Sequence, residues 1–279
     1  MTAKIISICN LKGGVGKTTL VMALAEYLAG DTMYNKRVLA IDLDAQSNLT
    51  NAMMSDEVWE WEYNSRGLTL PFLFQNAEYA LDDINVKDFI VKDNVSNVRK
   101  NNSFLCLHLI PNSPKFFTIH ANLTAGAITT LFQVIQPVLP NYDYILIDCP
   151  PSINKIVKSA FYASDYCLIP CVASRMSVYG LELLLEQIDI FNRDYQHNLK
   201  AIGTVICRYN NTVSQVEKLA LMMINPFIPA IFYHKILERA KIAESLNFQH
   251  NLTYKQKYGD VHDVMVKITK EFIQKVDLE

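Results

Sequence analysis

One segment near the amino terminus constrains the fold more than any other part of the chain. A glycine-rich loop, Lys12–Thr19, directly follows the apolar run Ile5–Cys9 and opens an amphipathic stretch, Thr18–Ala29. Glycines let successive backbone N–H groups turn inward, and a helix N-terminus adds unpaired N–H donors and a partial positive charge. Phosphate oxygens need such donors close together. The strand–loop–helix order therefore predicts an α/β fold that binds a nucleotide.

The side chains of this loop have the chemistry that a nucleoside triphosphate requires. Lys17 is expected to reach the β- and γ-phosphates, and the Thr18 hydroxyl to bind Mg²⁺. The strict phosphate-loop pattern begins with glycine, where this chain has Leu11, and a second lysine, Lys12, follows it. The residues predicted to bind the nucleotide are Lys12, Gly13, Gly14, Val15, Gly16, Lys17, Thr18 and Thr19.

Further apolar runs alternate with helical patterns along the chain. The predicted strands after the first are Val38–Ile41, Leu105–Ile110, Tyr144–Ile147, Tyr166–Ile169 and Ala201–Cys207. Later helices are predicted at Val178–Phe191, Val213–Ile224 and Val264–Val276. Continuous β-branched runs separated by helices indicate a mostly parallel, twisted sheet with helices on both faces.

Composition bounds the class of protein. The chain has 279 residues, half of them hydrophobic, with Lys+Arg 26 against Asp+Glu 28. This balance favours an ordinary solvated surface, although a local basic patch within 151–279 could still contact DNA. No linker or repeat interrupts the sequence, so we expect a single domain over 1–279. Six cysteines without a C-x-x-C pair, no signal peptide and no long apolar run indicate a cytoplasmic protein.

Residues 55–103 fit the alternating pattern less well. The stretch begins with acidic residues around Trp59 and Trp61 and has helical hints only at Leu70–Phe74 and Val86–Ile90. Two tryptophans in acidic surroundings could form a surface for a partner protein. Packing of a helical lid on the sheet is the favoured alternative.

Acidic residues follow two of the predicted strands. Asp42 and Asp44 come after Val38–Ile41, and Asp148 follows Tyr144–Ile147. Ligands of parallel sheets bind beyond the carboxyl ends of the strands, and carboxylates there can hold Mg²⁺ directly or through water. Each acid alone could be a turn residue or a strand-end cap. Their position after strands favours a metal and water site.

Together these motifs resemble those of the ParA/MinD ATPases, with the ParA (Soj-like) partition ATPases as the closest group. The loop K-G-G-V-G-K-T-T is similar to the family's deviant Walker A motif. The segment D-L-D-A-Q is similar to its D-x-D-P-Q motif, and D-C-P-P to its D-x-P-P segment. The resemblance covers the chain apart from 55–103. It implies a P-loop NTPase fold of the SIMIBI type, with ATP or ADP and Mg²⁺ as ligands.

The resemblance also implies a role for each residue. Lys17 and Asp44 would act in ATP hydrolysis, with Asp44 orienting the attacking water. Mg²⁺ would be held by Thr18, Asp42 and Asp148. Lys12 would cross a homodimer interface to the nucleotide of the second subunit. ATP would then close the dimer and hydrolysis would open it.

In ParA-like proteins such a switch binds DNA without sequence preference, and an adaptor protein of the ParB type or another cargo adaptor stimulates hydrolysis. The resemblance implies that this chain partitions or positions a plasmid, chromosome or other cargo in the bacterial cytoplasm, near the nucleoid. Expected DNA contacts are Lys241, with Lys235 and Arg239 nearby, while Asn211 stands where many relatives have arginine. The late segment I-L-E-R-A-K-I-A-E resembles the family's I-P-R-N-V-R-L-A-E but has Leu237 in place of the usual proline, which in relatives lies near the adenine.

Other functions remain open. A MinD-like ATPase that cycles on a membrane would need an amphipathic last helix, and Val264–Val276 has an apolar stripe with basic neighbours, although an ordinary core-facing helix has one too. A carrier of metal clusters would need exposed thiolates, for which Cys167 and Cys171 are poorly spaced. A nucleotide sensor without catalysis is disfavoured because Lys12, Lys17, Asp44 and Asp148 are all present.

Overall fold

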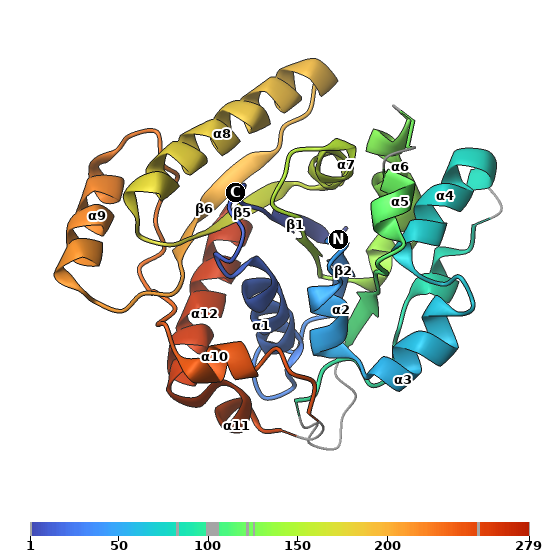
Figure 1. Ribbon diagram of the computed structural model, residues 1–279, viewed down its shortest axis with the longest axis horizontal. Coiled ribbons are helices and arrows are strands. Elements are labelled where there is room, and N and C mark those ends of the chain that lie inside the picture. The colour runs from blue at the N-terminus through green and yellow to red at the C-terminus, as the bar shows by residue number, and fades with distance from the viewer. Residues whose placement is uncertain are drawn as a thin grey trace.

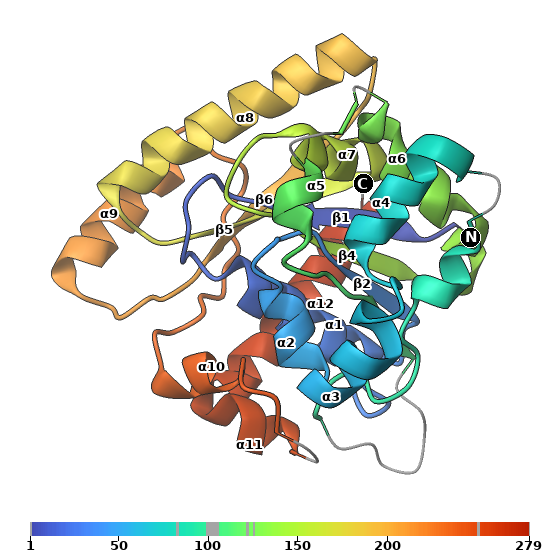
Figure 2. The same ribbon diagram turned by 45° about the vertical axis from the view of Figure 1, so that its right-hand side comes forward.

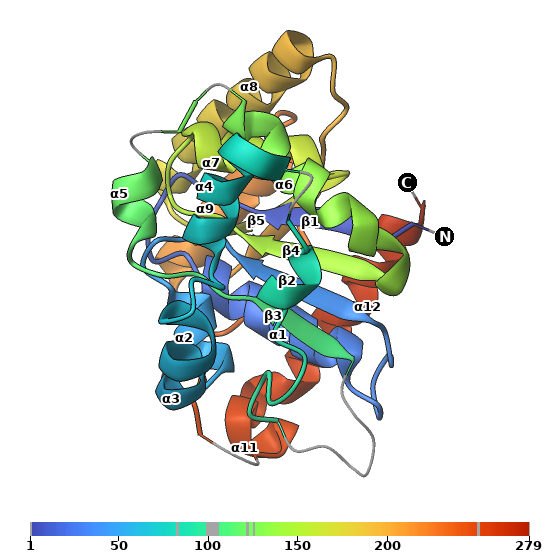
Figure 3. The ribbon, with the colours of Figure 1, turned by 90° about the vertical axis from the view of Figure 1, so that its right-hand side faces the viewer.

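Six short apolar runs form the central sheet. The computed structural model describes residues 2–81, 84–98, 106–120, 123–124, 126–249 and 252–278. All neighbouring strands are parallel, in the order β3-β2-β4-β1-β5-β6. The strands are β1 (Lys4–Ile8), β2 (Val38–Asp42), β3 (Leu107–Ile110), β4 (Tyr144–Asp148), β5 (Tyr166–Cys171) and β6 (Lys200–Ile206). Figure 3 shows β5, β1, β4, β2 and β3 stacked in this sequence.

The predicted parallel α/β fold is confirmed, and so is each predicted strand to within a few residues. The first residue predicted for the third strand, Leu105, lies outside the described residues. The neighbouring inner strands β2 and β4 are buried along their whole length. Their continuous apolar runs follow from this, because both sides of a covered parallel sheet face other elements.

Helices cover both faces of the sheet (Figure 1). One hydrophobic cluster lies under α1 (Lys17–Ala29), α2 (Asn48–Met53), α11 (Tyr254–Tyr258) and α12 (His262–Leu278). The other lies under α4 (Leu70–Ala80), α5 (Phe116–His120), α6 (Ala127–Ile135), α7 (Lys155–Ala163), α8 (Arg175–Tyr195) and α9 (Val213–Ile224). The remaining helical segments are α3 (Asp56–Val58), η1 (Trp59–Asn64), η3 (Val86–Phe89), η4 (Gln136–Asn141), α10 (Ala240–Glu244) and η5 (Gly259–Val261).

The stretch at 55–103 is mainly helical where it is described. It contains α3, a π-helical turn at η1, α4 and η3. Its two tryptophans differ in environment. The indole of Trp59 is partly buried and donates a hydrogen bond of 2.9 Å to the carbonyl of Asn112. Trp61 is 74% exposed, so it packs little against the sheet.

The last helix packs on the core along its apolar stripe. Met265, Ile268, Phe272 and Val276 of α12 are fully buried against α1 and the sheet. Within the described ranges, no helix combines the length and the apolar character that crossing a bilayer demands.

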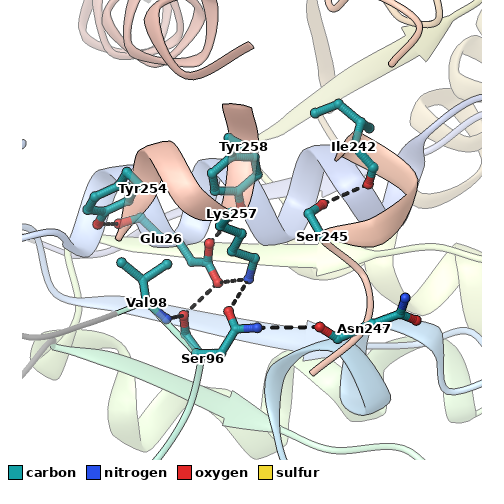
Figure 4. Close-up of polar contacts among 10 residues, drawn as sticks. Glu26, Ser96, Val98, Ile242, Ser245, Asn247, Tyr254, Lys257 and Tyr258 are labelled. Carbon is teal, nitrogen blue, oxygen red and sulfur yellow. Dashed lines mark hydrogen bonds and ion pairs between the residues drawn. The ribbon is translucent and has the colours of Figure 1, made fainter. Parts of the chain in front are cut away.

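A buried ion pair fixes the far end of α1 (Figure 4). The carboxylate of Glu26 accepts hydrogen bonds from Lys257 Nζ at 2.6 Å, Ser96 Oγ at 2.6 Å and Tyr258 Oη at 2.5 Å. Lys257 Nζ also donates to Oδ1 of Asn97 at 2.6 Å, so the pair is embedded in further polar contacts. The helix that begins at the glycine-rich loop is thereby joined to α11 and to the 95–98 segment.

Candidate nucleotide-binding site

The site lies at the carboxyl edge of the sheet, beside the start of α1. The strand register places Asp42 of β2 directly opposite Asp148 of β4. A cavity of about 720 Å³ opens here. Its wall combines the loop residues Gly13, Gly14, Gly16, Lys17, Thr18 and Thr19 with Asp44 and a second segment from Ile236 to Leu246. The sequence motifs at 12–19 and 42–44 therefore border one cavity, although they are far apart in the chain.

Two glycines of the loop have backbone conformations that other residues rarely adopt. Gly14 has φ of 71° and Gly16 has φ of 96°, both in the left-handed region. A Cβ at Gly16 would also lie 3.4 Å from Cβ of Cys207, at the end of β6. The turns of the loop at these two positions therefore favour glycine.

Lys17 is the first residue of α1, and its side chain is only 7% exposed. Its Nζ donates to the carbonyls of Asn10 and Lys12, each at 3.2 Å. The ammonium group is therefore held against the loop itself. A charge at this place, with the N-terminus of α1 beside it, suits the β- and γ-phosphates of a nucleotide.

Thr18 and Asp148 form the part of the site that best fits a magnesium ion. Thr18 Oγ1 donates to Oδ2 of Asp148 at 2.7 Å. The other oxygen, Oδ1 of Asp148, is buried and accepts no hydrogen bond within the described structure. Burial raises the pKa of Asp148 well above its ordinary value, and the nearby Asp42 raises it further. A cation with bound water would satisfy the free oxygen and stabilise the carboxylate charge.

Asp42 shapes the turn that leads into α2. Its Oδ2 accepts from the amide and the hydroxyl of Thr50, at 2.9 and 2.7 Å. Its Oδ1 accepts from the amide of Asp44 at 3.2 Å. Burial raises the pKa of Asp42 to about 7 in spite of these bonds. The carboxylate of Asp42 therefore stabilises this turn, in addition to its predicted role as a magnesium ligand.

Asp44 lies in the cavity wall and is partly exposed. One side-chain oxygen, Oδ1, accepts from the amide of Gln46 at 3.0 Å, and its carbonyl accepts from Nδ2 of Asn112 at 2.9 Å. These bonds fix the backbone and orient the carboxylate at the cavity. A carboxylate so placed can hold a water molecule near the bound phosphates.

Two of the predicted loop residues do not line the cavity. Val15 is buried in the core, and Lys12 is exposed at the rim. The backbone of Lys12 is fixed, since its amide donates to Oδ1 of Asn10 at 2.9 Å. Its side chain is exposed to solvent.

The three predicted DNA contacts lie on the segment beyond β6. Arg239 lines the nucleotide cavity, and its Nε pairs with Oδ2 of Asp260 at 2.7 Å. Lys241 Nζ lies 3.1 Å from a carboxylate oxygen of Glu244. Lys235 Nζ donates to the carbonyl of Tyr233. All three are near one another in sequence, and two of the cations already have acidic neighbours.

Comparison with known proteins identifies the family. A family described as an AAA domain matches residues 3–201. The sporulation initiation inhibitor protein Soj of Bacillus subtilis is 31% identical over 222 residues, covering 77% of this chain and 78% of the relative. This chain belongs to the ParA-type P-loop ATPases. The predicted family is thereby confirmed.

Two further similarities agree with this ParA-type assignment. The chromosome-partitioning ATPase Soj of Thermus thermophilus is 26% identical over 243 residues, with 87% of this chain and 84% of the relative covered. The structure of a variant of Cyanothece McdA in complex with ATP superposes with a TM-score of 0.76 at 25% identity. That superposition covers 98% of this chain and 97% of McdA.

Some residues that build the site of this ParA-type ATPase were not predicted. Asn10 bridges β1 and β5, because its Nδ2 donates to the carbonyl of Pro170 at 2.8 Å while its Oδ1 receives the amide of Lys12. Arg208 donates to the carbonyl of Gly14 at 3.2 Å. A polar residue directly after a strand was the available signal for Asn10. No local sequence signal indicated Arg208, which contacts the loop although it lies 194 positions after Gly14 in the chain.

Proposed function

We propose that this chain is an ATP-dependent, dimerising switch ATPase. In this proposal its ATP state binds DNA without sequence preference and positions a cargo through an adaptor protein. The observation that carries the proposal is the pair of Thr18 and Asp148 beside the loop, with one buried carboxylate oxygen free for a cation shell. The ATP complex of the related McdA supports the choice of nucleotide.

Hydrolysis would depend on positioning and on charge neutralisation. The amides of the loop and Lys17 would bind the phosphates, while Thr18, Asp148 and Asp42 would hold Mg²⁺. The chemistry supplied by a bound Mg²⁺ is neutralisation of charge on the β- and γ-phosphate oxygens. Asp44, which also lines the cavity, would orient the attacking water. The partner subunit's Lys12 stabilises the charge that develops on the γ-phosphate, because this lysine is exposed at the rim.

The surface near the site supports dimerisation. Helix α8 begins shortly after β5, and the carboxyl end of β5 is on the same sheet edge as the site. Two apolar residues in the first turns of α8, Met176 and Tyr179, are 71% and 66% exposed. Helix α9 lies beside α8 in Figures 1 and 2, and Nδ2 of Asn225 donates to Glu182 at 3.0 Å. Large apolar side chains exposed together favour burial in an interface. We assign this surface to the second subunit of the ATP-bound dimer.

Two alternative functions are less well supported. A MinD-like use of α12 on a membrane would need its apolar stripe, which is buried against α1 and the sheet. A carrier of metal clusters would need accessible thiolates. Cys167 and Cys171 are both buried, and burial raises the pKa of Cys171 to about 11, so its thiol stays protonated at neutral pH.

Binding to a random-sequence DNA duplex at stated salt tests the proposal. We expect binding with ATP but not with ADP or without nucleotide, and we expect Lys241→Ala to weaken it severalfold by removing a phosphate contact. Lys87→Ala is the matched control, because this exposed lysine belongs to the segment that packs on the other face of the sheet. Absence of DNA binding in every nucleotide state would contradict the DNA-based function and leave the ATPase to be tested separately.

A further inference from the structure

A charged pair in the cavity wall, Arg208 with Glu238, takes no part in the mechanism above. Arg208 follows β6, and its Nε and Nη2 donate to Oε1 of Glu238 at 3.0 and 2.7 Å. Its Nη1 donates to the carbonyl of Gly14 in the phosphate loop at 3.2 Å. The backbone of Arg208 has φ of 53°, in the left-handed region that residues other than glycine rarely adopt. Such strained positions are concentrated at ligand sites.

These contacts give the groups along the cavity a definite order. Gly14 belongs to the phosphate-binding end, Arg208 contacts it, and Glu238 contacts Arg208. After Glu238 and Arg239, the residues of this segment that line the cavity are apolar: Ala240, Ile242, Ala243 and Leu246. A nucleotide has the same order of chemistry, from charged phosphates through a hydroxylated sugar to a flat, largely apolar base. A nucleotide with its phosphates at Gly14 would bring its sugar toward Glu238, the next acidic group along these contacts.

The chemistry of Glu238 also fits a sugar. A carboxylate only accepts hydrogen bonds, and the donors of a ribose are its two neighbouring hydroxyl groups. Oε1 of Glu238 is used by Arg208, while Oε2 receives no hydrogen bond from the described part of the chain. The backbone of Glu238 is held in place, since its amide donates to the carbonyl of Tyr209 at 2.9 Å.

Arg208 offsets the negative charge of Glu238 in a cavity that would also hold negatively charged phosphates. A carboxylate without a neighbouring cation would repel the negative charge of a nucleotide. Two guanidinium N–H groups on one oxygen offset that charge and leave the second oxygen as a possible acceptor. The related segment I-P-R-N of the family has arginine where this chain has Glu238. The acceptor at Glu238 is therefore a feature of this sequence rather than of that family segment.

We propose that Glu238 accepts hydrogen bonds from the ribose hydroxyls of the bound nucleotide, and that Arg208 is the positioning residue that orients and neutralises it. This inference rests on the proposed nucleotide-binding function. It assigns to the 236–246 segment a preference for ribonucleotides over deoxyribonucleotides.

Calorimetric titration with ATP, 2′-deoxy-ATP and 3′-deoxy-ATP in the presence of Mg²⁺ tests the inference. The unaltered protein should bind at least one deoxy analogue about tenfold more weakly than ATP, because a hydrogen bond to a charged group is lost. Glu238→Ala should bring ATP and that analogue to within about twofold. Arg208→Ala should weaken ADP binding, and adding Glu238→Gln should restore ADP affinity but not the preference for ribose.

Glu244→Ala serves as the control, since Glu244 is an exposed acid of the same segment that does not line the cavity. It should keep the full discrimination between ATP and the deoxy analogue. Equal affinity of the unaltered protein for ATP and both analogues would overturn the inference, and so would full discrimination by Glu238→Ala. A protein that binds no nucleotide at all would instead contradict the proposed function.

Discussion

At the scale of single residues, the site contains charges that the folded protein alone does not stabilise. Asp42 and Asp148 lie opposite each other on the neighbouring buried strands β2 and β4, and burial raises the pKa of both. Oδ1 of Asp148 has no hydrogen-bond partner among the described residues. We interpret Asp148 as a buried carboxylate that ligand binding requires. Without the ligand this carboxylate makes the folded protein less stable.

Replacing Asp148 by asparagine should therefore stabilise the nucleotide-free protein in a pH-dependent way. A carboxyl whose pKa is raised on folding contributes stability at low pH, and that contribution is lost as the pH rises above about 4. Asparagine does not titrate, so the advantage of Asp148→Asn should grow between pH 4 and pH 8, to about 1–3 kcal/mol. Calorimetric unfolding at several pH values measures it.

Asp143→Asn provides a control of opposite sign. Its hydrogen bonds with Arg37 hold the pKa of Asp143 below its ordinary value, so its stabilising contribution is present above about pH 4. Removal of this charge should cost more stability at pH 5 than at pH 3, and the cost should stay constant between pH 5 and pH 8. If Asp148→Asn followed the same trend as Asp143→Asn, the interpretation of Asp148 as a buried, unsatisfied acid would be wrong.

At the scale of helices and strands, the phosphate loop depends on what holds α1. The buried carboxylate of Glu26 joins α1 to Lys257 and Tyr258 of α11 and to Ser96 (Figure 4). The amide of Ser96 in turn donates to the carbonyl of Met53 at 2.7 Å, at the end of α2. One polar cluster thus connects the helix after the loop with the helix after the acidic motif.

Lys257→Ala should be strongly destabilising, because it leaves the charge of Glu26 buried without a cation. We expect the free energy of unfolding to fall by about 3–5 kcal/mol, as for other broken buried pairs. Denaturant titration measures this, with Lys255→Ala as the control on an exposed position of the same helix. The control should change stability by less than about 0.5 kcal/mol. Similar values for the two variants would show that the cluster contributes little.

The elements were largely predictable from sequence, and the polar cluster was not. Continuous apolar runs such as Val38–Ile41 predict buried parallel strands, and the glycine loop predicts where α1 begins. Glu26 and Lys257 are 231 positions apart, and nothing local to either residue indicates its partner. The same holds for Arg208 and Gly14, which are 194 positions apart. The hydrophobic pattern of a segment predicts whether that segment is buried. It does not predict which distant residues come into contact, because that depends on how the segments pack together.

At the scale of the whole molecule, the proposed hydrolysis requires a second subunit. The motifs at 12–19, 42–44 and 148 meet at one sheet edge, as expected for motifs that follow the carboxyl ends of parallel strands. Lys12 remains exposed at the rim, outside the cavity that the other charged residues border. Exposed apolar side chains of α8 lie near the same edge. We therefore take completion of the site by the partner subunit's Lys12 as the central claim.

Mixing two inactive variants tests this claim most directly. Lys12→Ala and Asp44→Ala should each hydrolyse ATP very slowly, since each lacks one catalytic group. In a mixed dimer, the subunit with Asp44 intact would receive Lys12 from its partner and have one complete site. Random pairing in an equal mixture should then restore about a quarter of the rate of the unaltered protein. A mixture no faster than the average of its two components would show that Lys12 does not act across a dimer, and would contradict the account.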